Sequence, residues 1–242
     1  MNESQTKWLN FRKGEVDYLE IPKDNFQETL SPNLELTKEM KKKGIKLGIT
    51  PAQDNIYYFA LNQNHSILKK RKVRQAMAYA IDEKKYNKLF FNSTADLGHT
   101  LLPPGIPGNN PPLESPYIGA KREKAKKLLK EAGHPEGKGI PELTMIVKSS
   151  TLARQVGGFL KSEMRKIGIP VKVETLEWSR LFERANSGEY DIFYLAWFVG
   201  IPTGFEFFEL IYGPNSPDSY NRVDYNNPEI DKLFKKGKTM AN

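Results

Sequence analysis

The sequence predicts an α/β fold in which helices flank a mixed β-sheet that contains a βαβ crossover. A strand-favouring run at 143–147, a helical pattern at 152–167 and a second strand run at 171–176 define the crossover. Parallel strands joined by a helix cross over in the right-handed sense. Two more apolar runs, at 56–61 and 190–197, are typical of buried strands, and the second is expected to be buried on both faces.

The start of the chain is expected to form a strand, a short helix and a turn. Val16, Tyr18 and Ile21 belong to the apolar run that favours the strand, and Pro32 marks the turn. Residues 73–91 then show apolar side chains at helical spacing, with the charged residues grouped on the other face. This pattern predicts the clearest amphipathic helix of the chain.

The segment 101–116 contains too many prolines and glycines for regular structure, and we expect a long loop there. Further helices are predicted at 121–132, which ends at Gly133, and at 178–185. Near the end of the chain Asn227 can cap a closing helix, with Pro228 at its first position.

Composition excludes several classes of function. The 242 residues include 37 Lys and Arg, 29 Asp and Glu and no cysteine, so the formal charge is +8 and disulfides, thiolate metal sites and cysteine nucleophiles are ruled out. No run approaches the roughly 18 apolar residues of a membrane span. The polar first residues do not resemble a secretory signal.

Motifs for catalysis, metals and cofactors are missing as well. His65, His99 and His134 are far apart and lack neighbours at metal-ligand spacing, and no nucleotide-binding or nucleophile-elbow motif occurs. We therefore expect no metal, no cofactor and no enzymatic activity. A small hydrolase or transferase is another alternative, and it would have to bring acidic residues into one pocket. The acidic residues near the βαβ unit are more simply explained as surface charges: Glu174, Glu177, Glu183 and Asp191.

The lysine clusters at 41–43, 69–72 and 235–238 raise the alternative of a basic nucleic-acid-associated domain. These clusters are dominated by lysine and are not interleaved with aromatic stacking platforms. We therefore expect no nucleic-acid partner. Strongly salt-dependent retention on DNA would favour the alternative.

A series of ordered segments resembles the family 5 solute-binding proteins of bacterial ABC importers, the oligopeptide- and dipeptide-binding type. The most specific is Val73 to Asp82, VRQAMAYAID, which is similar to the family's VRQALAYAID helix. Tyr57 to Asn62 resembles its YYLGFN segment, and residues 13–17 resemble its GEID strand. Other matches lie at Leu102 to Gly108, residues 123–133, Gly188 to Asp191, Tyr212 to Asn215 and Asn227 to Asp231.

The resemblance implies a lobe of a type II periplasmic-binding-protein fold. Residues 1–55 would be the end of the first lobe and a linker, and residues 56–242 a second lobe, truncated at its C-terminus. Such proteins enclose a solute between two lobes and deliver it to the permease subunits of an ABC transporter. The implied location is periplasmic, or extracytoplasmic and tethered to the membrane, without a span of its own.

The resemblance also implies which residues bind the ligand, a peptide or peptide-like solute. Tyr57, Tyr58 and Asn62 would lie in the strand that crosses between lobes, where backbone groups can pair with an extended ligand. A buried strand without ligand contact is the other interpretation. Trp197 and Phe198 would face the cleft as an aromatic wall, and core packing is the alternative for Trp197.

One departure from the family concerns Gly200. Family peptide binders usually carry Asp at this place in a W-x-x-D-Y-P-D-P motif, and it pairs with the α-amino group of the ligand. Here the chain reads WFVGIPTG from Trp197 to Gly204. The resemblance therefore leaves open a blocked peptide, a non-peptide solute, or a substitute acid such as Glu206 or Glu209.

Overall fold

The computed structural model describes residues 3–49, 55–109, 115–215 and 220–240. The chain divides into two compact units, the first made of 1–53 with 87–95 and the second of 54–86 with 96–242. Each unit has its own buried side chains.

The first unit is helical. It contains α1 (Glu3–Lys13), a 3₁₀ turn η1 (Lys23–Asn25), α2 (Phe26–Thr29) and α3 (Lys38–Lys42). Trp8 and Met40 are buried, and the Trp8 indole Nε1 donates to Glu28 at 2.7 Å. The predicted strand at 16–21 is wrong, because the segment finds no partner strand and Tyr18 is exposed.

The second unit is built on a four-stranded mixed sheet in the order β1-β4-β2-β3. The strands are β1 (Asn55–Leu61), β2 (Leu143–Lys148), β3 (Val171–Leu176) and β4 (Ile192–Phe198). Strand β2 runs parallel to β3 and to β4, whereas β1 pairs with β4 antiparallel. Helix α7 (Thr151–Arg165) links β2 to β3, which confirms the predicted βαβ unit.

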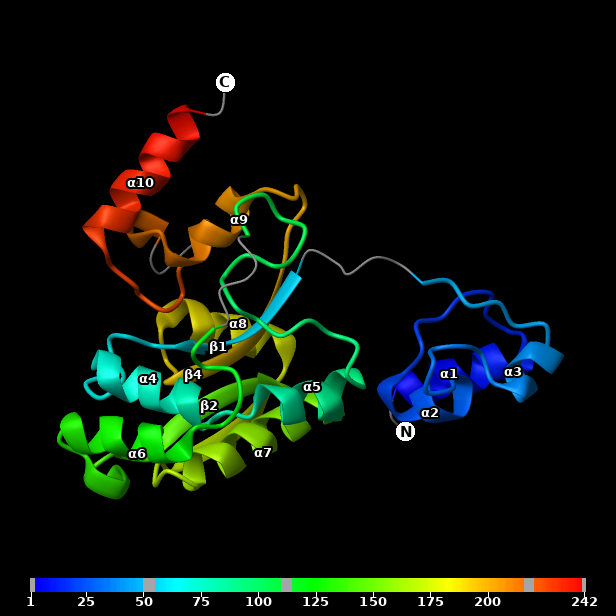
Figure 1. The fold of residues 1–242 in the computed structure, drawn as a ribbon, viewed down its shortest axis with the longest axis horizontal. Coiled ribbons are helices and arrows are strands. Elements are labelled where there is room, and N and C mark those ends of the chain that lie inside the picture. Colours follow the sequence, from blue (N-terminus) through cyan, green and yellow to red (C-terminus); the bar gives the residue numbers. More distant parts are fainter. Residues whose placement is uncertain (1–2, 50–54, 110–114, 216–219, 241–242) are drawn as a thin grey trace. The chain divides into compact units, whose positions relative to one another are not determined.

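Helices cover both faces of this sheet, as Figure 1 shows. On one face α4 (Arg71–Ala80), α6 (Arg122–Glu131) and α7 pack on Leu143 and Met145 of β2. On the other face α8 (Trp178–Ser187) packs on Ile146 and Phe193. Alternate side chains of a strand point to opposite faces, so β2 contributes to both layers.

The long helix predicted at 73–91 is instead two helices, α4 and α5 (Glu83–Phe91). The break lies at Ile81, which has extended backbone angles, and at Asp82, whose carboxylate accepts the backbone N–H of Lys85 at 3.0 Å. Asp at such a position caps a new helix, and this local signal outweighs the continuous apolar stripe.

The predicted loop forms turns at residues 101–109, and its residues 110–114 lie outside the described part. Five further helical elements complete the described part of the second unit. They are η2 (Pro135–Gly137), α9 (Gly204–Phe208), η3 (Glu209–Ile211), η4 (Gly213–Asn215) and α10 (Pro228–Thr239). The predicted cap of α10 is confirmed, because the Asn227 side chain accepts the N–H of Glu229 at 3.1 Å. No helix among the described residues has the length and apolar character of a membrane span.

Candidate functional site

The candidate site lies at the sheet edge where the parallel strands β2 and β4 reach their carboxyl ends. Ligand sites of open α/β sheets form at such edges. The antiparallel β1 begins at the same edge, with Asn55 opposite Phe198 and Ile56 opposite Trp197. The pairing therefore brings Tyr57, Tyr58, Trp197 and Phe198 into one region, while Asn62 lies beyond the opposite end of β1.

Aromatic side chains form an exposed surface on one face of this edge. The ring centroids of Tyr57 and Phe198 are 6.4 Å apart, and the Tyr194 ring stacks 6.4 Å from Tyr57. The residues Tyr57 and Phe198 are 43% and 59% exposed. Large apolar side chains exposed together are typical of a surface that binds a ligand or partner.

This surface extends inward through Tyr194, which the sequence-based prediction missed. The hydroxyl groups of Tyr86 and Tyr194 are 2.8 Å apart, within hydrogen-bond distance. Burial raises the pKa of Tyr194 to about 12, with the hydrogen bond to Tyr86 acting in the opposite direction. Burial also raises the pKa of Tyr86, so both phenols are neutral at physiological pH and serve as packing and hydrogen-bonding groups. The alternation of side chains along β4 could have identified Tyr194, four residues before Phe198.

Tyr58 and Trp197 lie on the other face of the sheet. Tyr58 packs on the cluster of Ala60 and Phe193, and burial raises its pKa to about 12 despite the opposing charge of Arg222. The Trp197 indole Nε1 donates to the carbonyl of Glu206 at 3.1 Å, and its ring lies 4.9 Å from that of Tyr220. These two predicted site residues are thus largely packed within the chain.

The loop after β4 is held by a carboxylate. The two Glu206 oxygens accept the backbone N–H groups of Gly200 and Ile201, each at 3.1 Å. Glu209, the other candidate for a substitute acid, instead faces Lys238 at 3.5 Å. A Cβ atom added at Gly200 would meet nothing within 4 Å. The structure therefore places one carboxylate beside Gly200 and leaves open space at the glycine itself.

β4 differs from the prediction of a strand buried on both faces. Its first two residues, Ile192 and Phe193, are buried, but the residues from Tyr194 onward are half-buried and Phe198 is exposed. The second half of the strand belongs to the candidate site, which explains why its apolar character does not produce full burial.

Asn62 supports the fold rather than lining this edge. It is 7% exposed, and its Nδ2 donates to the carbonyls of Gly188 at 3.0 Å and Tyr190 at 2.9 Å. Its Oδ1 accepts the N–H of Asn64 at 3.0 Å. These bonds connect the end of β1 to the turn before β4.

Replacing Asn62 with alanine is expected to lower the free energy of unfolding by about 1–3 kcal/mol, the usual penalty for leaving buried polar groups without partners. Urea unfolding followed by circular dichroism measures the change. Asn64→Ala is the control, because Asn64 is exposed and contributes only its backbone to this network. Equal midpoints for Asn62→Ala and the unsubstituted chain would contradict this structural role.

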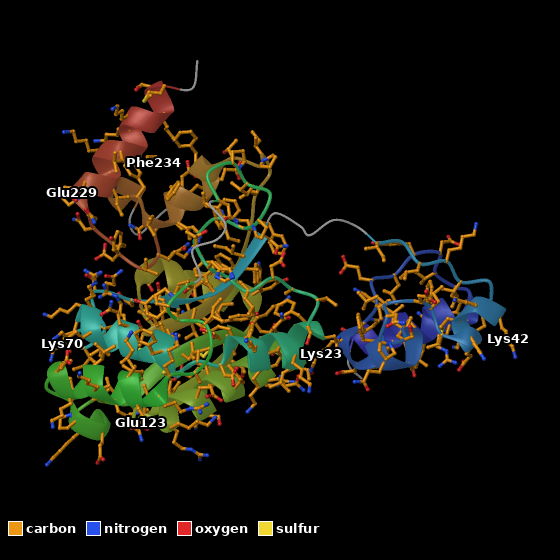
Figure 2. The ribbon with its side chains drawn as sticks, in the orientation of Figure 1. Lys23, Lys42, Lys70, Glu123, Glu229 and Phe234 are labelled. Carbon is orange, nitrogen blue, oxygen red and sulfur yellow. The ribbon has the colours of Figure 1, made fainter. Side chains whose placement is uncertain are left out.

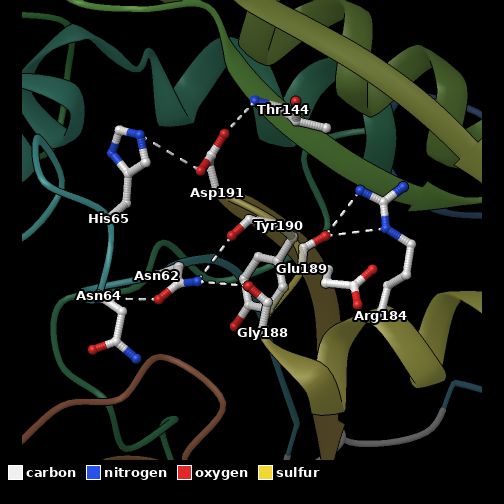
Figure 3. A pocket seen from close by; sticks show the side chains of 9 residues that line it. All are labelled: Asn62, Asn64, His65, Thr144, Arg184, Gly188, Glu189, Tyr190 and Asp191. Atoms are coloured by element: carbon white, nitrogen blue, oxygen red, sulfur yellow. Dashed lines mark hydrogen bonds and ion pairs between the residues drawn. The ribbon is translucent and has the colours of Figure 1, made fainter.

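A pocket of about 470 Å³ opens at the opposite edge of the sheet, around Asn62. Figure 3 shows several of its polar groups bonded to one another: Asp191 accepts the N–H of Thr144 at 2.7 Å and lies 3.8 Å from His65. Arg184 donates through Nε and an Nη atom to the carbonyl of Glu189. The pocket is polar and most of its ionisable side chains are engaged locally, so we do not assign the ligand to it.

The acidic residues near the βαβ unit do not converge. Glu174 pairs with Lys172 and Arg184, and Glu183 pairs with Arg180. Across the described residues, no three His, Asp or Glu side chains are arranged to hold a metal ion. The aromatic edge with its Glu206 carboxylate is suited to binding a solute by stacking, packing and hydrogen bonding.

Comparison with known proteins identifies similar chains. The model of the bacterial extracellular solute-binding proteins, family 5 Middle, matches residues 1–219. The Dipeptide-binding protein of Escherichia coli is 29% identical over 75% of this chain and 34% of its own length. Heme-binding protein A of Haemophilus influenzae is 25% identical over 99% of this chain and 42% of its own.

The fold is also similar to that of a solved structure. DppA of Helicobacter pylori, an ABC transporter-associated periplasmic binding protein in complex with the peptide STSA, superposes with a TM-score of 0.82. The two sequences are 23% identical, over 100% of this chain and 44% of that one. This chain thus spans about a third to less than half of the length of the proteins that it matches.

Proposed function

Because this chain belongs to the bacterial extracellular solute-binding proteins of family 5, we propose that it forms part of the solute-binding component of an ABC importer. In this proposal the protein captures a peptide or peptide-like solute between two lobes and delivers it to the permease, without making or breaking bonds. It works outside the cytoplasmic membrane, in the periplasm or tethered to the membrane surface.

The observation that carries the proposal is the aromatic surface at the carboxyl end of β4. Tyr57, Tyr194 and Phe198 present apolar area that can pack on many different side chains, because an aromatic wall does not select by hydrogen bonding. In the described sheet β1 has a strand neighbour on one side, β4. An extended ligand can align with β1 in the manner of an added strand.

The residues at this edge divide into three roles. Tyr57 and Phe198 contact the solute directly, since both are substantially exposed. Trp197 and Tyr58 stabilise this edge by packing and hydrogen bonding on the other face of the sheet. Gly200 leaves room at the end of the strand, and Glu206 supplies the negative charge beside it.

Residue 200 has no carboxylate, and this favours a second class of ligand for the same importer, namely solutes without a free amino group. A free α-amino group enclosed in a dry cleft needs an anionic partner, and here the adjacent carboxylate is already bonded to two backbone N–H groups. A solute without a free amine avoids this requirement. The heme-binding relative is an example of a family member whose name denotes a non-peptide ligand.

Native mass spectrometry of the protein that carries this chain, purified without denaturation, tests the proposal. Peptides that travel with the protein would support peptide import. A single non-peptide mass would support import of another solute class. Protein that carries nucleic acid and no small solute would contradict the proposal and favour the basic-domain alternative.

Introducing a carboxylate through Gly200→Asp is expected to increase affinity for peptides with a free amino group by about ten- to a hundredfold. Hydrogen bonds to charged groups contribute about 1.5–3 kcal/mol, and a Cβ atom at Gly200 meets no other atom within 4 Å. Isothermal titration calorimetry with a tripeptide and its N-acetylated form measures the discrimination between free and blocked amines.

Gly200→Asn is the matched control, because it has nearly the same shape without the charge. The Glu206 carboxylate would repel the carboxylate introduced at position 200 and reduce the gain in peptide affinity. The double variant Gly200→Asp, Glu206→Gln removes this repulsion and shows the effect of the new carboxylate alone. The same gain in Gly200→Asp and Gly200→Asn, or a gain that persists on the N-acetylated peptide, would show that no amine reaches this position.

A further inference from the structure

The positive charge of the chain is concentrated in one layer of helices. We define the basic layer as residues 69–86, 121–131 and 151–166, which comprise α4, the first turn of α5, α6, α7 and adjoining residues. It holds 17 of the 37 Lys and Arg but only 5 of the 29 Asp and Glu. The layer therefore carries a net charge of +12, and the rest of the chain carries −4.

The basic layer covers a single face of the sheet. Apolar side chains of α4, α6 and α7 join one hydrophobic core with the residues of β2 that point to this face. The start of α5 belongs to the same layer, because the Tyr86 ring lies 5.5 Å from that of Phe159 in α7. The exposed charged side chains consequently point away from the sheet, as the sticks on α4 and α6 in Figure 2 show.

Most of these cations are available to a partner. Thirteen of the 17 are exposed, and only three of the thirteen lie within ion-pair distance of a carboxylate in the described residues: Lys72, Lys85 and Lys166. The acids of the layer are engaged or buried. Glu131 pairs with Lys72, Glu123 with Lys126, and the Glu163 side chain is fully buried.

We propose that the basic layer binds the surface of a bilayer that contains anionic phospholipid. Lysines spread over a broad surface are complementary to a bilayer surface with mobile, negatively charged head groups. Each hydrated ammonium group can interact with a different head group. Twelve of the 17 cations are lysines. The attraction requires no insertion, and it holds the protein at the membrane by its helical face.

The same observations argue against single-stranded nucleic acid as the partner. Single-strand binding uses aromatic rings as stacking platforms among the cations. Tyr79, the aromatic residue beneath the Lys124 ammonium, is buried, with its ring centroid 4.2 Å from that Nζ atom. The large hydrophobic residue that the layer exposes is Leu152, which cannot stack on a base.

Membrane binding by this face is compatible with solute binding. The exposed residues of the candidate site, Tyr57, Phe198 and Gly200, lie at the carboxyl edge of the strands, and the site meets the basic layer where Tyr194 contacts Tyr86. The inference rests on the distribution of charge and holds whatever solute the protein carries.

Flotation with vesicles tests the inference. We expect the chain to bind vesicles with about 30 mol % phosphatidylglycerol in phosphatidylcholine, at least about tenfold more tightly than pure phosphatidylcholine. Binding is expected to disappear at about 0.5 M NaCl, because salt screens surface charges. Equal binding to both vesicle types would overturn the inference.

Charge-neutralising variants locate the surface. Lys69→Gln, Lys127→Gln, Lys130→Gln and Lys161→Gln together change four exposed residues that have no carboxylate within ion-pair distance among the described residues. We expect this variant to lose about tenfold or more in affinity for the anionic vesicles. Near-ultraviolet circular dichroism confirms that it remains folded.

The matched control removes the same charge from exposed lysines elsewhere, through Lys42→Gln, Lys46→Gln, Lys235→Gln and Lys236→Gln. The control is expected to lose less than about threefold, the effect of overall charge alone. Equal losses in both variants would show that net charge and not this face is responsible. Binding to duplex DNA with little binding to anionic vesicles would overturn the inference in favour of a nucleic-acid partner.

Discussion

Replacing Gly168 with alanine is expected to lower the free energy of unfolding of the second unit by about 3–5 kcal/mol. Gly168 follows α7 with φ +83°, a left-handed conformation that favours glycine. A Cβ atom there would lie 1.9 Å from the carbonyl oxygen of Glu136. That oxygen belongs to the backbone, so no side-chain rotation can relieve the clash.

The close approach is mutual, because a Cβ atom on Gly137 would lie 2.0 Å from the carbonyl oxygen of Gly168. The two glycines therefore allow the turn after α6 to contact the end of α7. Urea unfolding at neutral pH measures the change. Gly133→Ala is the matched control, since Gly133 has φ +88° but open space around its Cβ position.

The control separates conformational strain from the steric clash. Gly133→Ala is expected to lower the free energy of unfolding by about 1–2 kcal/mol, the penalty of a left-handed alanine. If Gly168→Ala produced no larger loss than Gly133→Ala, the backbone contact with Glu136 would not be a packing constraint. The difference between the two variants thus measures the close approach itself.

The fold was predictable wherever the signal is local. The βαβ unit follows from two strand runs around a helical pattern, and the cap of α10 follows from Asn227 and Pro228. The strand predicted at 16–21 failed because a strand needs a neighbour, and no sequence pattern near Val16 supplies one. The break at Asp82 was missed because an apolar stripe continued across a capping residue.

The candidate site was predictable only in part, since it depends on strand pairing. Alternation along β1 separates Tyr57 from Tyr58, but only the register with β4 brings Tyr57 next to Phe198. This pairing joins residues separated by more than a hundred positions, which periodicity cannot detect. The contact of Glu206 with Gly200 likewise depends on how α9 folds back on the loop.

The second large effect is expected from Glu163, a carboxylate buried between α6 and α7. Its side chain is 0% exposed and contacts Arg122 at 2.8 Å and Lys166 at 2.6 Å. Removing one partner of a buried ion pair typically destabilises a protein by about 3–5 kcal/mol. Because Arg122 and Lys166 are partly exposed and can regain water, we expect Glu163→Gln to lower the free energy of unfolding by about 2–3 kcal/mol.

The effect should depend on pH. Burial raises the pKa of Glu163, but hydrogen bonds from Lys166 and Arg122 outweigh it and hold the pKa below the ordinary value. A carboxylate with a lowered pKa in the folded state stabilises the protein above its pKa in the unfolded chain. This stabilisation is lost as the pH falls through the lowered value. The glutamine variant lacks this component, so the difference from the unsubstituted chain should shrink in acid.

Urea midpoints of the two proteins at neutral pH and at about pH 3 test this expectation. Glu123→Gln is the matched control, because Glu123 lies in the same helix as Arg122 but is 90% exposed and pairs with Lys126 at 3.4 Å. The control is expected to change stability by less than about 0.5 kcal/mol at either pH. A Glu163→Gln effect as small as that of Glu123→Gln, or one that grew in acid, would mean that the buried carboxylate does not hold α6 against α7 by its charge.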